Sequence, residues 1–285
     1  MTNARMSPTL RRMELARRLR ALRETSGKSL EDVAGELLCS PSKISRIETG
    51  ARGASARDVR DLCRIYAVPE DTQHYLMDLA REAKQRGWWQ AFDEVVSDYT
   101  MLMGLEAGAS AIHQYETVLV PGLLQTVDYS RALMRRISPA VSDDAAEQYV
   151  ISRQERQQRL FGDDPPEYWA IMDEAAVRRQ VGGVKVMNDQ IEHLIRCAEE
   201  HRVILQIIPF LAGAHPGMEG NFEMLHYEDA VSTDVVYVEG RAGNLFLHRE
   251  ADLRLHRQTF DHLRATAESP DHTIDRLQRI IDDCQ

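Results

Sequence analysis

The sequence predicts two domains: an all-α domain that contains a helix-turn-helix, followed by an α+β domain with a mixed or antiparallel sheet. The first observation is the length of 285 residues, which exceeds the usual size of a single domain. The second is periodicity, because apolar residues recur at helical spacing up to residue 86, whereas short β-rich runs alternate with helical segments thereafter. We expect a helix-turn-helix domain at residues 1–69, a connecting helix at 70–87 and an effector-binding and dimerisation domain at 88–285.

The third observation is a change in the sign of the charge along the chain, whose formal net charge is -10. Residues 1–64 hold 14 basic and 8 acidic side chains, whereas residues 65–285 hold 21 basic and 37 acidic ones. The two parts therefore have net charges of +6 and -16. Only the N-terminal part is suited to a polyanion such as DNA.

Composition excludes several classes of protein. No segment approaches the length of about 18 apolar residues that a membrane span needs, and the Arg-rich N-terminus has no apolar signal region, so we expect a cytoplasmic protein. The cysteines have neither CxxC spacing nor a disulfide pattern: Cys39, Cys63, Cys197 and Cys284. We therefore expect no metal site, no disulfide and no cofactor.

The first two helices follow from apolar periodicity and caps. One apolar stripe is formed by Leu15, Ala16, Leu19 and Leu22. Ser29 is a good N-cap for a second helix, and Asp32 stands three residues later, where its carboxylate can accept from free amides. The apolar residues of that helix match the helical template: Leu30, Val33, Ala34, Leu37 and Leu38.

A third helix follows almost at once. Ser40 is its expected N-cap, Pro41 suits its first turn, and Gly50 ends it. A fourth helix begins after the cap Ser55 and is closed by Pro69. Two short helices joined by a tight turn within such a bundle make a helix-turn-helix.

Residues 10–68 resemble the XRE family, which has the helix-turn-helix of Cro and phage repressors. The resemblance is carried by Leu30, Ala34, Leu37, Ser40, Ile44, Ser45, Ile47, Glu48 and Gly50. In that family the second helix of the motif lies in the major groove. The resemblance implies a DNA-binding set made of Lys28, Ser29, Ser40, Pro41, Ser42, Lys43, Arg46, Arg52 and Arg57.

Roles within this set follow from side-chain chemistry. Lys43 and Arg46 can read guanine O6 and N7, whereas Pro41 can offer only apolar contact. Phosphates are expected at the start of the second helix and at the basic residues that flank the motif. The alternative is a helical bundle whose arginines are only a solvated face.

Two further positions of the motif are structural. The resemblance implies an ion pair between Arg23 and Glu48, since a carboxylate that faced DNA would repel phosphate. Leu38 stands in the turn where the family usually has Gly. If φ is positive there, a non-Gly residue costs roughly 1 kcal/mol.

The second domain alternates helical and extended segments. We expect helices at 94–107, 126–136, 142–160, 184–200, 250–267 and 272–281, and strands at 111–117, 167–172, 203–209, 221–226, 235–239 and 245–248. Trp88 and Trp89 precede this region, and either pack the domains together or stack on a ligand.

Residues 88–283 are similar to the C-terminal domain of unknown function of actinobacterial developmental regulators of the WhiJ and AbaA type. The similarity rests on VLVPGLLQT, the RQERQ run, AHPGMEGNFE and the VVYVEG and NLFL segments. It implies control by a small partner protein of the BldB type.

Catalysis is not expected, because the chain contains no HExxH, GxSxG or phosphate-binding glycine motif. The Gly-rich loop at 214–221 is either a ligand or partner site or an ordered surface connection. The candidate effector residues are Trp88, Trp89, Tyr115, His215, Glu219 and Asn221. A buried apolar pocket near these residues would indicate a small-molecule ligand, and an exposed apolar patch a protein partner.

The sequence thus predicts a sequence-specific transcriptional regulator, expected to be a dimeric repressor that binds a pseudo-palindromic operator. Its C-terminal domain would respond to a partner protein or a ligand. The alternative is an antitoxin-like scaffold whose main task is to hold a small partner, with DNA binding used for autoregulation.

Overall fold

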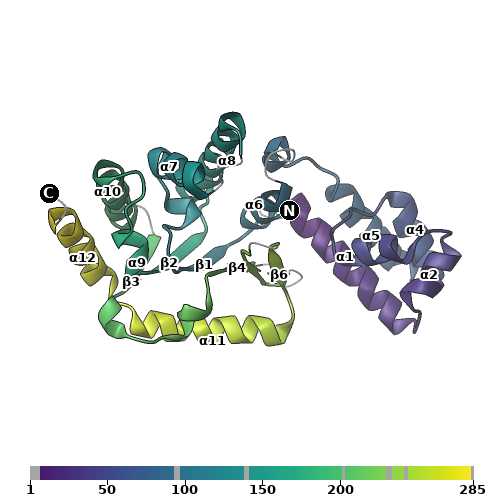
Figure 1. The fold of residues 1–285 in the computed structure, drawn as a ribbon. Coiled ribbons are helices and arrows are strands. Elements are labelled where there is room, and N and C mark those ends of the chain that lie inside the picture. Colours follow the sequence, from purple (N-terminus) through teal and green to yellow (C-terminus); the bar gives the residue numbers. More distant parts are fainter. Residues whose placement is uncertain are drawn as a thin grey trace. The chain divides into compact units, whose positions relative to one another are not determined.

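The computed structural model describes residues 7–92, 97–137, 141–200, 203–228, 233–240 and 243–283. The chain forms two compact units, Met1–Gln90 and Ala91–Gln285, drawn in Figure 1. The N-terminal unit is helical and the C-terminal unit contains a six-stranded mixed sheet, so the predicted fold class is confirmed.

The N-terminal unit is a bundle of helices around one apolar core. Its helices are α1 (Pro8–Thr25), α2 (Leu30–Glu36), α3 (Pro41–Glu48), α4 (Ala56–Ile65) and α5 (Glu70–Glu82), followed by the 3-10 helix η1 (Trp88–Phe92). Most of the predicted inward residues are buried, with Leu19, Val33 and Ile44 at 0% exposure. Leu22, Leu30 and Leu37 are partly buried, and Leu38 is 94% exposed, which differs from its place in the predicted apolar pattern. Side-chain caps start the first four helices, at the predicted Ser29, Ser40 and Ser55 and at Ser7, which was not predicted.

Helix α5 differs from the connecting helix expected at 70–87. Its residues Leu76 and Leu79 belong to the same core as Leu19, and α5 packs against α1 and α4. Arg11 Nε also lies 2.6 Å from Glu82 Oε2. An amphipathic helix beside a bundle with an open apolar face buries its stripe there, so α5 is part of the N-terminal unit.

The C-terminal unit is built on one sheet with the strand order β3-β2-β1-β4-β5-β6. Its strands are β1 (Ala111–Glu116), β2 (Glu167–Asp173), β3 (Val203–Ile208), β4 (Phe222–His226), β5 (Val235–Val238) and β6 (Leu245–Leu247). The first three strands are parallel to each other, whereas β4, β5 and β6 pair antiparallel. Helices separate the parallel strands in the chain, as crossover connections require.

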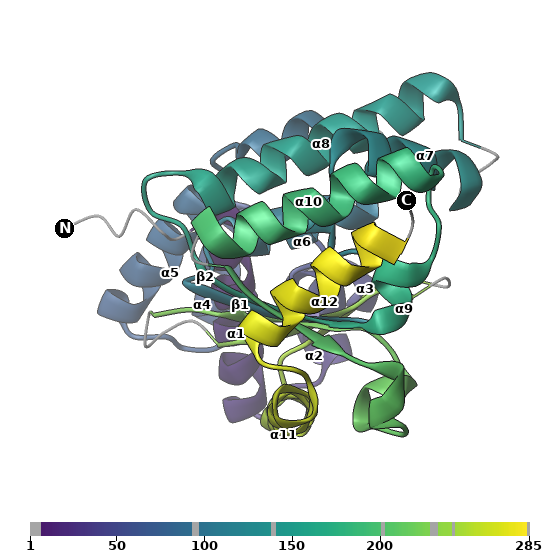
Figure 2. The same ribbon diagram turned by 90° about the vertical axis from the view of Figure 1, so that its left-hand side faces the viewer.

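Helices cover both faces of this sheet (Figures 1 and 2). Its helices are α6 (Ser97–Glu106), α7 (Val127–Ile137), α8 (Asp143–Phe161), α9 (Glu174–Arg178), α10 (Val184–Glu200), α11 (Glu250–Thr266) and α12 (Pro270–Asp283), with 3-10 turns η2 (Gly122–Leu124), η3 (Phe210–Ala212) and η4 (Pro216–Glu219). Helix α11 lies on one face together with η4, and its Phe260 and Leu263 pack on Tyr115 and Ile171. Helices α6, α7, α8 and α10 lie on the other face.

The predicted strands and long helices of this unit are observed within a few residues of the expected bounds. The first residues of the helix expected at 94–107 lie outside the described residues, and its observed part begins at Ser97. Helix α9 was not predicted, because its single turn is too short to show a period.

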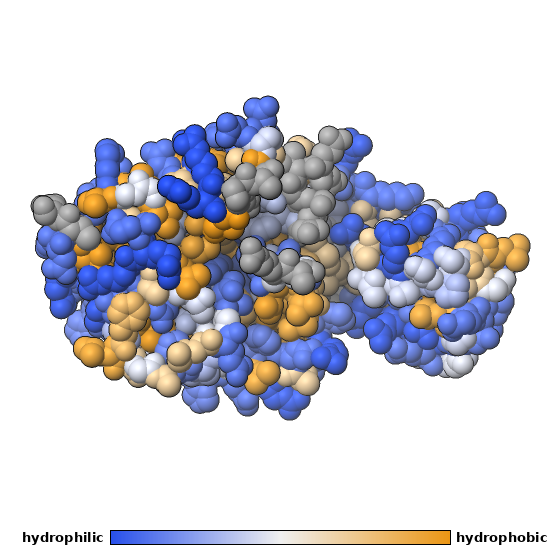
Figure 3. All heavy atoms as spheres, in the orientation of Figure 1, coloured by the Kyte–Doolittle hydropathy of each residue, from blue (hydrophilic) through white to orange (hydrophobic). Residues whose placement is uncertain are grey.

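The face of each unit seen in Figure 3 is largely hydrophilic, with apolar side chains in groups between the polar ones. Within the described part of the chain, no helix is long and apolar enough to cross a membrane. The same residues contain no cluster of three or more His, Cys, Asp or Glu that could hold a metal ion.

Candidate nucleic-acid interface

Reciprocal caps start the helix α2 of the helix-turn-helix. Asp32 N donates to Ser29 Oγ at 3.0 Å, and Ser29 N donates to Asp32 Oδ2 at 2.9 Å. The hydrogen bonds from Ser29 lower the pKa of the Asp32 carboxyl. Two amides at the start of α2 are therefore already satisfied, and a phosphate there would meet a carboxylate, so this end offers less to DNA than the sequence predicts.

The turn between α2 and α3 has the left-handed geometry that a Gly usually supplies. Leu38 has a φ of 52°, and Cys39 N donates to Ala34 O at 2.9 Å. The side chain of Leu38 is 94% exposed. The turn is thus closed in the Schellman manner although its left-handed residue carries a Cβ.

Replacing Leu38 with Gly should leave the free energy of unfolding unchanged or raise it by up to about 1 kcal/mol. The reason is that relief of the left-handed strain in the folded state outweighs the greater conformational entropy of Gly in the unfolded state. Leu38 buries no apolar surface that this change would lose. Ala67, which also has a φ of 52°, is a matched site where Gly should act in the same direction. Urea denaturation measures both, and a loss of several kcal/mol would contradict this account.

Helix α3 is amphipathic and presents a polar face. Ile44 and Ile47 are buried at 0% and 2% exposure, whereas Pro41, Ser42 and Arg46 are exposed. The guanidinium of Arg46 has no carboxylate partner among the residues that the structure describes. Helix α3 can therefore bring a free cation and two small side chains to a base edge.

Arg23 holds the C-terminal end of α3. Its Nε lies 2.8 Å from Glu48 Oε1, its Nη2 lies 3.0 Å from Glu48 Oε2, and its Nη1 donates to Lys28 O at 3.0 Å. The hydrogen bond to Glu48 raises the pKa of Arg23. One guanidinium thus ties α1 both to α3 and to the loop that precedes α2.

Lys43 is held in a way that the sequence analysis did not anticipate. Its Nζ lies 2.5 Å from Asp58 Oδ1, and Asp58 also forms a capping box with Ser55 at the start of α4. Burial raises the pKa of Asp58, but the hydrogen bonds from Lys43 and Ser55 outweigh it and lower the value. The ammonium group expected to read a base is therefore engaged with α4 in this state.

Asp58 contacts Lys43, a candidate base-reading residue, and the sequence did not indicate this contact. The Ser-x-x-Asp spacing from Ser55 to Asp58 is a capping-box signal, so the cap itself was detectable. The contact with Lys43 joins residues 15 positions apart on different helices. No local pattern reports such a pair.

The expected phosphate-binding residues differ in whether their charges are already paired with a carboxylate. Lys28 Nζ lies 2.7 Å from Glu36 Oε1, and Arg57 Nε lies 3.8 Å from Asp61 Oδ2. Such exposed pairs contribute little and can exchange for phosphate. Arg52 is exposed without an ion-pair partner in the described ranges, and its N donates to Arg46 O at 2.9 Å. Arg46 and Arg52 therefore form the free basic edge after α3.

The candidate effector residues are divided between the two units. Trp88 and Trp89 belong to the N-terminal unit, with ring centroids 5.9 Å apart. Trp89 is 6% exposed, and a Cβ on Gly87 would lie 2.3 Å from its ring, so Trp89 is packed against its own chain, whereas Trp88 is 39% exposed. Tyr115 is fully buried on β1 of the C-terminal unit.

The loop at 214–221 is anchored on the sheet. The ring centroids of His215 and Tyr115 lie 6.1 Å apart in an edge-to-face arrangement, and His215 Nε2 lies 3.4 Å from Asp173 Oδ2. A Cβ on Gly217 would lie 2.5 Å from the Tyr115 ring, so only Gly fits. Glu219 is exposed and Asn221 half-buried. This arrangement agrees with an ordered connection more than with a ligand pocket.

Comparison with protein families gives two matches. A model described as a helix-turn-helix domain matches residues 14–76. A model described as Domain of unknown function (DUF5753) matches residues 99–279. Comparisons with curated proteins and with solved structures give no match.

Proposed function

The chain belongs to the family of the Domain of unknown function (DUF5753), and we propose that it is a sequence-specific transcriptional regulator that binds DNA through α3. The observation that carries this proposal is the outer face of α3, where Arg46 is exposed and unpaired within the described residues, beside Pro41 and Ser42. In a helix-turn-helix, this face enters the major groove.

Base reading is assigned first to Arg46, whose guanidinium can donate two hydrogen bonds to guanine O6 and N7. Ser42 can donate to or accept from a base edge, and Pro41 can contact a thymine methyl group. Arg52 and Arg57 would bind phosphate beside the helix. Lys43 acts here as a positioning residue, because its contact with Asp58 fixes α3 against α4.

A single module of this size binds weakly, so the regulator is proposed to act as a dimer on a pseudo-palindromic operator. The acidic C-terminal unit would not contact DNA itself, and would adjust DNA binding when it receives a partner protein or a ligand. A repressor role is the simplest version of this proposal. The length of the protected DNA and the mass of the free protein test the dimer.

Replacing Arg46 with Ala should weaken binding to the preferred operator by about 1–3 kcal/mol and relax the preference at one base pair. The operator is obtained by selecting fragments of the host genome on the intact protein. Affinities are then measured at several salt concentrations, because phosphate contacts give a steep dependence on salt.

The matched control is Arg81 to Ala on α5, which removes the same charge from a side chain that is 73% exposed and paired with Asp78. It should bind the operator within a factor of about two of the parent. Failure to enrich any fragment, or equal affinity of both variants and the parent, would show that α3 is not the reading helix.

A further inference from the structure

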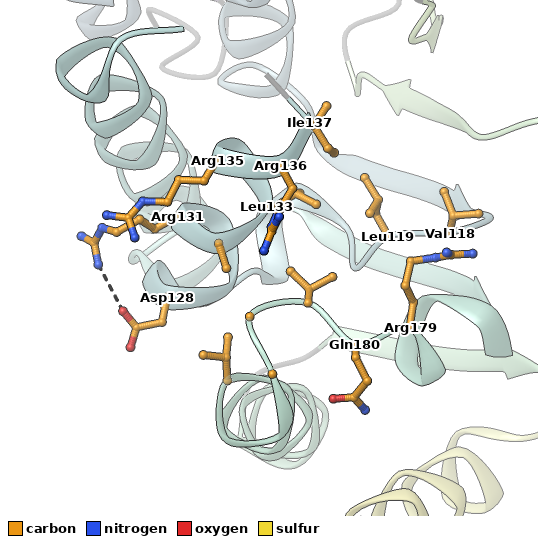
Figure 4. A pocket seen from close by; sticks show the side chains of 15 residues that line it. Val118, Leu119, Asp128, Arg131, Leu133, Arg135, Arg136, Ile137, Arg179 and Gln180 are labelled. Atoms are coloured by element: carbon orange, nitrogen blue, oxygen red, sulfur yellow. Dashed lines mark hydrogen bonds and ion pairs between the residues drawn. The ribbon is translucent and has the colours of Figure 1, made fainter. Parts of the chain in front are cut away.

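The C-terminal unit contains a large open groove that involves none of the candidate effector residues. Its cavity volume is about 1040 Å³. One wall is α7, and the opposite wall is the connection from α9 to α10 (Figure 4). The segment that follows β1 contributes Val118 and Leu119.

The floor and parts of the rim are apolar. Leu133 and Val181 line the groove and are 5% and 8% exposed, whereas Val118 and Ile137 on its rim are 43% and 55% exposed. Gly182 lets the two walls approach, because a Cβ there would lie 2.9 Å from the Cβ of Ala132. The groove therefore offers exposed apolar side chains that a partner could cover.

Arginines stand on both walls. Arg135 and Arg136 lie on α7, and Arg179 lies on the opposite wall (Figure 4). All three are exposed, and the structure gives none of them a carboxylate partner in the part of the chain that it describes. Arg131 differs, because its Nη1 lies 3.1 Å from Asp128 Oδ1 and its Nη2 lies 2.9 Å from Glu147 Oε1.

Helix ends explain only part of this arrangement. Arg135 and Arg136 are in the last turn of α7 and Arg179 caps α9, where a cation contributes about 0.3–1 kcal/mol. That effect does not require cations on both walls of an apolar groove. These arginines also lie in a region, residues 65–285, whose net charge is -16.

We propose that this groove binds an acidic amphipathic segment of a partner protein. Apolar side chains of the segment would lie between Leu133 and Val181, and its carboxylates would pair with Arg135 or Arg136 on one side and with Arg179 on the other. Such a segment matches the groove in both charge and hydropathy.

The dimensions favour a peptide over a small ligand. Small-molecule sites usually enclose about 300–1,000 Å³ and bury most of the ligand. The volume of this groove, about 1040 Å³, is slightly above that range, and its arginines are exposed. The assignment goes beyond DNA recognition and does not depend on it.

The test is a selection of random displayed peptides of about 12 residues on the full-length protein. We expect enriched peptides to combine Asp or Glu with Leu, Ile or Phe at helical spacing. A synthetic copy of the most enriched peptide is then used in direct titrations. The variant R135E/R179E should bind this peptide about 10- to 100-fold more weakly, because both walls then repel it.

The matched control is R254E/R279E, which makes the same change of charge at exposed arginines of α11 and α12 that do not line the groove. It should retain affinity within about threefold. I137N leaves the charge unchanged and should weaken binding about threefold or more through lost apolar contact. All these side chains are exposed, so circular dichroism should show an unchanged fold.

Three outcomes would overturn the assignment: selection of no peptide, selection of peptides without acidic residues, or equal binding by R135E/R179E and its control. If no peptide is selected but dodecanoate binds in direct titrations, the groove would instead be assigned to small amphiphilic anions. Because the readout contains no DNA, loss of operator binding leaves this result unaffected, and the converse also holds.

Discussion

Replacing Arg156 with Met should lower the free energy of unfolding by about 3–5 kcal/mol, because it leaves a buried carboxylate without its counter-ion. Arg156 on α8 and Glu106 at the end of α6 are both 3% exposed. Arg156 Nε donates to Glu106 Oε2 at 2.8 Å, and the guanidinium also lies 4.7 Å from the centre of the Tyr99 ring. This pair joins two helices that cover one face of the sheet.

Two other carboxyl groups, those of Glu116 and Glu223, have raised pKa values that involve the same charges. Burial and the nearby Glu239 raise the pKa of Glu116 to about 8. Burial and Glu106 raise the pKa of Glu223 well above its usual range. Arg156 is the hydrogen-bonded counter-ion of Glu106, and its charge also lowers the pKa values of Glu116 and Glu223. Removal of Arg156 should therefore raise both of these pKa values further in the folded state.

The loss should therefore depend on pH. A carboxyl whose folded pKa lies above its unfolded value binds a proton on folding, so its destabilising effect grows as pH rises above the unfolded pKa. R156M should be less stable relative to the parent at pH 8 than at pH 5. Urea denaturation followed by circular dichroism at both values measures this difference.

The control is Arg131 to Met, which removes an exposed pair with Asp128 and Glu147 and should cost less than about 1 kcal/mol. The double variant R156M/E106Q should recover part of the lost stability, since no uncompensated charge remains. If R156M and R131M proved equally stable at pH 8, the buried pair would not stabilise this unit.

Local patterns were sufficient for the helix-turn-helix. Serine caps, the proline at the start of α3 and the spacing of Val33, Ile44 and Ile47 predicted its helices, and the structure places these residues as expected. The sign of φ at Leu38 was left open by the sequence, and the structure gives a φ of 52°. These features depend on residues within one or two helical turns of each other, which is the distance over which sequence patterns act.

Contacts between distant residues were not predictable in the same way. Lys43 and Asp58, or Arg156 and Glu106, are joined by tertiary packing, and neither pair leaves a periodic signal. The helix α5 showed its amphipathic pattern, but the pattern does not say which apolar surface it covers. The order of strands in the sheet likewise depends on long-range pairing.

The candidate effector residues show the same limit. They were chosen for residue type and loop composition, and the structure places Trp88 in the N-terminal unit and packs Gly217 against the buried Tyr115 in the C-terminal unit. The arginines of the groove come from segments more than 40 positions apart, Arg135 and Arg179. Composition alone gave this region a negative charge, and only the fold places Arg135 and Arg179 on opposite walls of one groove.

Replacing Arg23 with Met should lower the free energy of unfolding of the N-terminal unit by about 2–4 kcal/mol. The side chain of Glu48 is 5% exposed and its carboxylate accepts from Arg23 at 2.8 Å and 3.0 Å, so removal of the guanidinium leaves a buried charge. Lys28 O loses its donor as well. Thermal denaturation of the full chain at neutral pH measures the change.

The same substitution should weaken DNA binding more than its effect on the folded fraction explains, because Arg23 ties α3 to α1 while contacting no DNA itself. R20M is the matched control, since Arg20 on the same helix forms an exposed pair with Glu24 and should change stability by less than about 0.5 kcal/mol. E48Q should cost less than R23M, because it removes the buried charge and keeps a hydrogen-bond acceptor for Arg23. If R23M lowered stability without lowering operator affinity at temperatures where it is fully folded, the ion pair would stabilise the bundle but would not set the position of the reading helix.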